Sequence, residues 1–245
     1  MKLLPLLDRI KGFFLRLLKK LPDLISGALD FVYPPVCLVC GLYCEKDICP
    51  DCIKLVTRPD KKSFNIRELY AYGDFRYYAG YSGVVKEIIG RFKFKGEMWI
   101  GRRLGNILYE SFVDCFDYYD LIVYVPAGRA SFLKRGFDQC SEIAAGLSKR
   151  SGLPVLRALE SNSGKGRQHR LKRDSRKDNV TGRFRISDVL TKEELGKLRG
   201  SRTLLIDDIL TTGSTLRECA CLLIDECGCL KVDAMVFATG RTDIG

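Results

Sequence analysis

Two adjacent carboxylates, Asp207 and Asp208, stand between an apolar run at 203–206 and a turn rich in hydroxyl groups. A predicted helix follows the turn, which consists of Thr211, Thr212, Gly213, Ser214 and Thr215. Unpaired N–H groups and the helix dipole favour a phosphate at a helix N-terminus, and glycine lets the backbone come close. Carboxylates facing that phosphate would repel it, so we expect them to accept hydrogen bonds from sugar hydroxyls. The pattern predicts a site for a phosphorylated ribose.

Simpler interpretations exist for each residue of this segment taken singly. A strand end followed by an Asp or Thr helix cap would explain any one of them, but not the whole constellation. The turn is not a Walker A motif, which requires GxxxxGK followed by Ser or Thr. ATP hydrolysis is therefore not implied.

A second group of residues with chemical potential lies near the start of the chain. Cys37-Leu-Val-Cys40 and Cys49-Pro-Asp-Cys52 are two CxxC pairs within 16 residues, too few to bury a core unaided. Four thiolates in such turns suit tetrahedral zinc, whose binding would supply on the order of 10 kcal/mol of folding energy. A redox pair or coincidental buried thiols are the alternatives. Cys44 could replace Cys40 or Cys49 as a ligand, at the loss of one pair.

The composition of the whole chain indicates what kind of protein carries these two groups of residues. The chain has 245 residues, 46% of them hydrophobic, which is typical of a globular protein with one large domain and a small module. Eleven cysteines without a secretory signal indicate a reducing compartment, and the six outside 37–52 are expected to be buried small hydrophobes. The net charge of +11 favours anionic partners: nucleotides, nucleic acid or acidic membrane surfaces.

The order of predicted elements after residue 68 alternates between strand and helix. Extended structure at 69–81 is followed by helices at 84–92 and 99–112, and the apolar run 120–126 is typical of a buried parallel strand. A helix at 141–149, strands near Val155 and at 203–206, a helix at 214–227 and a strand at 232–238 complete the series. This rhythm predicts an α/β fold.

The first 21 residues carry leucine, isoleucine and phenylalanine at helical spacing, interrupted by charged residues. The segment is too short for a membrane span or a signal peptide. An amphipathic helix packed on the protein and a basic helix that touches a membrane or a partner both remain open.

The segment 203–216 resembles the phosphoribosyl pyrophosphate motif of class I phosphoribosyltransferases. The resemblance implies that Asp207 and Asp208 bind the ribose hydroxyls, that 211–215 bind the 5′-phosphate, and that magnesium accompanies the pyrophosphate. It also implies a pyrophosphate loop at Ala127-Gly128-Arg129. Catalysis in that family runs through an oxocarbenium-like state stabilised electrostatically, without a protein nucleophile.

The cysteine pairs and the phosphoribosyl motif together resemble the ComF family of competence proteins over most of the chain. Further matches are Pro34-Pro35, the segment 88–96 with its Arg-Phe-Lys-Phe-Lys-Gly ending, and Arg135-Gly136-Phe137-Asp138-Gln139, with Asp where the family has Asn. The late signature of the family appears as Gln168, Leu171, Arg176 and Asn179, followed by Gly182 and Phe184.

The stretch 165–185 holds nine Lys or Arg and two Asp. Three interpretations stay open: a solvated loop, a lid over pyrophosphate, or a nucleic-acid contact. The residues expected to form the lid or the nucleic-acid contact are Arg135, Arg170, Lys172, Arg173 and Arg176. His169 is expected to lie on the surface rather than to act as a base.

We therefore expect a helical segment at 1–33, a small zinc module with four cysteine ligands at 34–58 and a phosphoribosyltransferase-like domain at 65–245. The domain should be a mainly parallel sheet with helices on both faces. The resemblance implies a protein that binds phosphoribosyl pyrophosphate with magnesium and serves DNA uptake, with single-stranded DNA and uptake proteins as candidate partners. The alternative is an active phosphoribosyltransferase with an unknown acceptor. We expect a cytoplasmic location, with peripheral membrane contact left open.

Overall fold

The computed structural model describes residues 35–58, 73–162 and 182–240. The chain divides into two compact units, with the boundary between Pro50 and Asp51. The helix predicted at 1–33 and the core of the basic segment, 163–181, lie outside the described residues. The module and domain boundaries predicted at 58 and 65 stay predictions.

The described part of the first unit is a short turn structure held by backbone hydrogen bonds. Val36 and Tyr43 form an antiparallel bridge. The Leu38 N–H donates to the Asp47 carbonyl at 2.9 Å, and the Leu38 side chain is fully buried. This arrangement brings the two ends of the cysteine-containing segment toward each other.

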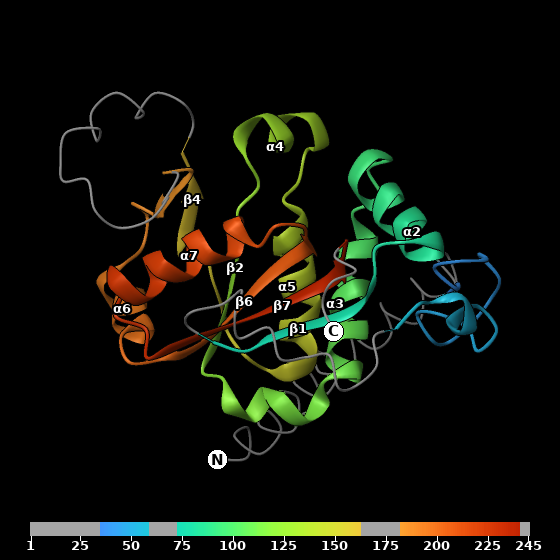
Figure 1. The fold of residues 1–245 in the computed structure, drawn as a ribbon, viewed down its shortest axis with the longest axis horizontal. Helices are drawn as coiled ribbons and strands as arrows, with labels where there is room; N and C mark the ends of the chain where they lie inside the picture. Colours follow the sequence, from blue (N-terminus) through green and yellow to red (C-terminus); the bar gives the residue numbers. More distant parts are fainter. Residues whose placement is uncertain (1–34, 59–72, 163–181, 241–245) are drawn as a thin grey trace, which may run out of the picture. The chain divides into compact units, whose positions relative to one another are not determined.

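The second unit is built on a five-stranded, all-parallel sheet in the order β1-β7-β6-β2-β3 (Figure 1). The strands are β1 (Phe75–Gly80), β2 (Leu121–Tyr124), β3 (Val155–Leu156), β6 (Arg202–Leu210) and β7 (Lys231–Thr239). Every residue of β2 is buried, as are eight of the nine residues of β7. Parallel strands covered on both faces must be apolar throughout, which explains why these segments are continuous hydrophobic runs.

Helices cover both faces of this sheet. The principal ones are α2 (Gly83–Phe94), α3 (Trp99–Ser111), α5 (Gln139–Ser151) and α7 (Ser214–Asp225). The chain passes outward from β2 through α5 to β3, and outward in the opposite direction from β6 through α7 to β7. Because parallel crossovers are right-handed, α5 and α7 lie on opposite faces, as Figure 1 shows. The predicted fold class is confirmed.

Glycines let α3 and α5 cross at very short range. A Cβ added to Gly146 would lie 2.1 Å from the Arg102 carbonyl oxygen, and one added to Gly105 would lie 2.3 Å from the Ile143 carbonyl oxygen. The close crossing fixes α5, whose N-terminus faces the carboxyl edge of the sheet. The Arg102 guanidinium adds an ion pair to Glu142 at 3.0 Å.

Several elements differ from the prediction. Strand β6 continues through both acids to Leu210 instead of ending at Ile206. A short helix α4 (Arg129–Arg135) begins in the expected loop after β2. The polar stretch before β6 contains a β4–β5 hairpin (Leu159–Ser161 with Phe184–Ile186) and α6 (Lys192–Leu198). The remaining described helices are the 3-10 turns η1 (Cys52–Leu55) and η2 (Val113–Tyr118).

Candidate functional site

The carboxyl ends of β2 and β6 lie side by side at the centre of the sheet. The two strands pair from Leu121 with Thr203 to Tyr124 with Ile206. The chain leaves β2 toward one edge of the sheet and leaves β6 toward the other. In open α/β sheets, a ligand binds outside the carboxyl ends of the strands at such a switch point. The loops that follow these two strands are those singled out from the sequence.

The acid pair lies near the end of β6, next to this edge. Asp208 is 9% exposed, and its Oδ2 lies 2.7 Å from the Lys93 ammonium of α2. The Asp207 Oδ1 accepts a hydrogen bond from the Asp208 N–H at 2.8 Å. Lys93 lies in the run 88–96 that carries part of the family resemblance, but the sequence does not identify it as a site residue. No local pattern signals it, because α2 and β6 are more than 100 residues apart in the chain.

The protonation of the acid pair is strongly perturbed. Burial raises the pKa of Asp207 to about 7, and the negative charge of Asp208 acts in the same direction. Two carboxylates so close cannot both ionise at their ordinary pKa. The pair can therefore accept hydrogen bonds from a diol while retaining a proton near neutral pH.

The turn after β6 leads directly into α7. Gly213 has φ +81°, a left-handed conformation that glycine adopts without strain. The Thr212 and Ser214 hydroxyls lie 3.1 Å apart, and both residues are exposed. Because the first N–H groups of a helix have no partner within it, this end of α7 can receive an anion.

Arg183, the residue before strand β5, contacts the N-terminal end of α7. Its guanidinium donates to the Ser214 hydroxyl at 3.2 Å and pairs with the Glu218 carboxylate at 3.2 Å. Glu218 is buried in α7 and also accepts hydrogen bonds from the N–H groups of Arg183 and Phe184. Arg183 is one of the nine basic residues of 165–185, and the sequence does not identify it as a site residue. Its position next to the predicted phosphate turn is a contact that the sequence did not reveal.

The residues Ala127, Gly128 and Arg129, expected to form the pyrophosphate loop, follow β2. Gly128 is the cap of α4, and Arg129 begins that helix. A cleft of about 470 Å³ adjoins them. It is lined by Gly128, Arg129, Ala130, Ser131 and Leu133 of this segment and by Ser161 and Asn162 of the β4 end.

Arg135, which we expected to act together with the basic segment, is the last residue of α4. Its guanidinium donates to the Gln139 Oε1 at 2.7 Å and lies over the Phe94 ring at 5.8 Å. Arg170, Lys172, Arg173 and Arg176 lie outside the described residues, as does His169. The lid and the nucleic-acid contact both stay predictions.

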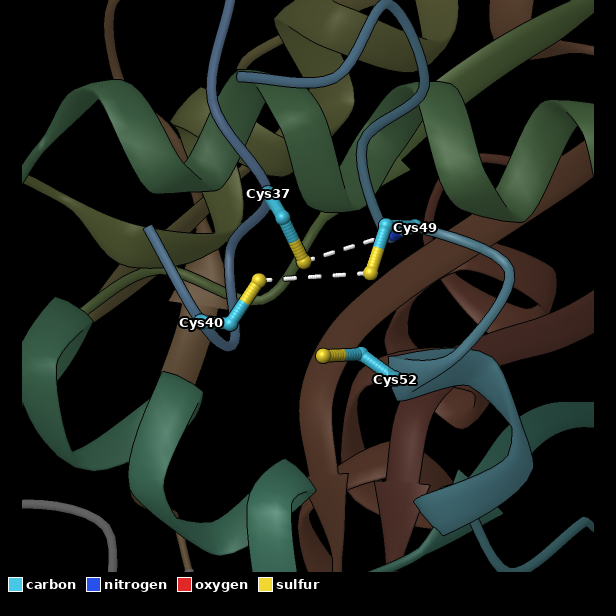
Figure 2. A group of neighbouring side chains, drawn as sticks. All are labelled: Cys37, Cys40, Cys49 and Cys52. Carbon is cyan, nitrogen blue, oxygen red and sulfur yellow. Dashed lines mark hydrogen bonds between the residues drawn. The ribbon is translucent and has the colours of Figure 1, made fainter. Parts of the chain in front are cut away.

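The two CxxC pairs bring four sulfur atoms together (Figure 2). The sulfurs of Cys37, Cys40, Cys49 and Cys52 all lie within 4.8 Å of one another, and those of Cys40 and Cys49 are 3.9 Å apart. Tetrahedral zinc with Zn–S bonds of about 2.3 Å needs sulfurs about 3.8 Å apart, so the group fits zinc. Cys44 is not a member of this group.

The surroundings of the Cys37 sulfur favour its thiolate form. Burial acts to raise the pKa of this thiol, but N–H donors outweigh it and lower the pKa to about 6. The donors include the Cys49 N–H at 3.3 Å and the Val39 N–H at 3.4 Å. Since metals bind the thiolate form, these N–H groups favour metal binding.

The comparisons with known proteins agree with this geometry. The family model of the phosphoribosyl transferase domain matches residues 148–244. The chain is 30% identical to competence protein F of Haemophilus influenzae over 142 residues, and 28% identical to competence protein ComFC of Bacillus subtilis over 192 residues. These matches support the resemblance to the ComF family. The matches cover 56% and 77% of this chain, and 60% and 71% of the relatives.

Solved structures with some likeness to this chain include an allosteric regulatory enzyme of purine biosynthesis. Another is glutamine phosphoribosylpyrophosphate amidotransferase from B. subtilis, complexed with ADP and GMP. Each matches with a TM-score of 0.37 and 19% identity, over 56% of this chain and 25% of the other. A likeness at that level supports no inference about function. Among the described helices, none has the length and apolar character needed to cross a membrane.

The magnesium expected for a phosphoribosyltransferase domain has no protein cage of its own at the acid pair. The third potential ligand beside Asp207 and Asp208 is the Cys140 thiol, a soft donor that suits magnesium poorly. The carboxylates fit a cation that is held mainly by phosphate oxygens of a ligand, which is how magnesium commonly binds at such sites.

Proposed function

We propose that this protein, which resembles the ComF family, binds phosphoribosyl pyrophosphate, together with magnesium, at the carboxyl edge of its sheet. The observation that carries the proposal is the convergence of two loops at the β2–β6 switch point. One contains the acid pair and the turn into α7, and the other is the segment 127–129. Each loop offers what one part of the ligand requires.

The ligand's parts match the chemistry of the site as follows. The ribose hydroxyls would donate to the carboxylates of Asp207 and Asp208. The 5′-phosphate would accept from the N–H and hydroxyl groups of the turn 211–215, with the α7 dipole adding to the attraction. The pyrophosphate, carrying magnesium, would lie at 127–129. Arg183, which donates to the Ser214 hydroxyl, would then lie within reach of the 5′-phosphate.

We further propose that the protein serves DNA uptake and natural transformation, because both curated relatives are named competence proteins. Single-stranded DNA and DNA-uptake proteins are the proposed partners, with the basic residues as the contact for DNA phosphates. The proposed location is the cytoplasm, at the inner face of the membrane when engaged with uptake proteins. Zinc at the four cysteines would be structural.

Calorimetric titration of phosphoribosyl pyrophosphate with magnesium into the purified protein tests the ligand. We expect Asp207→Ala and Thr212→Ala to abolish binding, since each removes groups that face one half of the ligand. Asp225→Ala changes an exposed carboxylate at the far end of α7 and is the matched control, which should bind like the native protein. Absence of binding by the native protein would refute the ligand assignment.

The biological role requires a separate test in cells. A chromosomal deletion should lower transformation frequency, and the native sequence should restore it, while Asp207→Ala should not. Restoration by that variant would separate DNA uptake from the ligand site. Release of pyrophosphate in the presence of a candidate acceptor would favour the alternative, an active phosphoribosyltransferase.

A further inference from the structure

The connection between α4 and α5 touches both of the loops that form the proposed site. Asp138 is the N-cap of α5, and its Oδ1 accepts from the N–H groups of Cys140 at 3.1 Å and Ser141 at 3.2 Å. Its Oδ2 accepts from the Ala127 N–H at 2.7 Å. One carboxylate therefore joins the start of α5 to the segment expected to bind pyrophosphate.

Cys140, two residues later, reaches the other loop. This residue is 6% exposed, and its thiol donates to the Asp207 Oδ1 at 3.3 Å. That oxygen also accepts the Asp208 N–H, so the carboxylate is held in one orientation from two directions. The free lone pairs of Asp207 are thereby left for a ligand.

A purely structural role does not account for the full set of contacts. Capping a helix takes one side-chain oxygen, and Asp138 uses its second oxygen on Ala127, outside the helix. An asparagine side chain at this position would have only one acceptor oxygen, so it could not accept both the helix N–H groups and the Ala127 N–H. Burial raises the pKa of Asp138, while the N–H groups of Ala127, Cys140 and Ser141 act to lower it.

We propose that Asp138 and Cys140 are positioning residues for this site: Asp138 sets the backbone of the segment 127–129, and Cys140 orients the Asp207 carboxylate toward the ribose. The proposal rests on the proposed binding of phosphoribosyl pyrophosphate. The two residues act on different ends of the ligand, because Asp138 acts on the pyrophosphate end alone. Cys140 acts on the ribose end.

Two ligands separate these effects by calorimetry. Ribose 5-phosphate lacks the pyrophosphate, so it tests only the ribose and 5′-phosphate contacts. We expect Asp138→Asn, which keeps the helix cap, to weaken phosphoribosyl pyrophosphate with magnesium about tenfold and ribose 5-phosphate less than about twofold. We expect Cys140→Ala to weaken both ligands by a similar factor, about three- to tenfold.

Cys227→Ala, a change at another buried cysteine, is the matched control and should leave both affinities unchanged. Equal losses for the two ligands in Asp138→Asn, or no loss for either ligand in Cys140→Ala, would overturn the proposal. Native protein that binds neither ligand would instead overturn the proposed function, and this inference with it.

Hydrogen exchange without any ligand gives a second measurement that does not depend on affinity. The amide of Ala127 should exchange faster in Asp138→Asn than in the native protein, because its acceptor is lost. The amides of the first turn of α5 should keep their native rates, because the cap remains. Unchanged exchange at Ala127 would overturn the role of Asp138.

Discussion

At the scale of single residues, the raised pKa of Asp207 has a consequence for stability. Its pKa is about 7 in the folded protein, against an ordinary value of 3.8. Between these two pKa values the folded state holds a proton that the unfolded state has lost. The contribution of this group to stability is therefore fully present below the ordinary pKa, and it is lost as the pH rises toward 7. We expect the free energy of unfolding, measured by denaturation at pH 5 and at pH 8, to fall more between these pH values for the native protein than for Asp207→Asn. Equal falls in both proteins would contradict this account.

Lys93 carries a second prediction at this scale. Its ammonium and the Asp208 carboxylate are 17% and 13% exposed, so the charge left by Lys93→Met would be largely buried. We expect the free energy of unfolding to drop by about 3 kcal/mol. Adding Asp208→Asn to that variant should recover part of the loss. Lys95→Met, at an exposed lysine, should cost little. Equal effects at both lysines would refute the importance of the pair.

At the scale of elements, the α3–α5 crossing depends on missing side chains. Gly146→Ala would place a methyl group 2.1 Å from the Arg102 carbonyl oxygen, so the helices must separate. We expect a loss of about 1 to 3 kcal/mol in urea denaturation. Gly90→Ala in α2 meets nothing within 4 Å and should instead gain up to about 1 kcal/mol. The same sign for both substitutions would contradict the described packing.

The elements with strong periodicity were predictable from the sequence, and those that depend on distant contacts were not. The apolar run of β2 and the helical spacing of α2 each carry their own signal. The β4–β5 hairpin does not, because three-residue strands are stabilised by partners such as the Glu218 carboxylate. Helix α6 could have been found, since Thr191 and Glu194 form a capping box with the expected spacing.

The same distinction holds for the candidate site. The acid pair and the turn 211–215 are contiguous in sequence, so their pattern could be recognised. Lys93, Cys140 and Arg183 come from other elements and meet the pair or the turn only after folding. The spacing of residues along the chain does not indicate such contacts.

At the scale of the whole molecule, we expect the purified protein to contain metal bound at the four-cysteine group. We expect about one zinc ion per chain by elemental analysis. Cys49→Ser should lose the metal, while Cys44→Ser, which changes the one cysteine of 37–52 outside the group, should retain it. Metal retained by Cys49→Ser and lost by Cys44→Ser would assign the ligands differently.

The proposed ligand site joins segments from most of the second unit, so its location is the central claim. Hydrogen–deuterium exchange with and without phosphoribosyl pyrophosphate and magnesium locates the ligand directly. We predict slower exchange in peptides that cover 127–129 and 207–217, and little change along β1 and η2. Protection confined to other segments, or none under conditions where the ligand is bound, would contradict a site at the β2–β6 switch point.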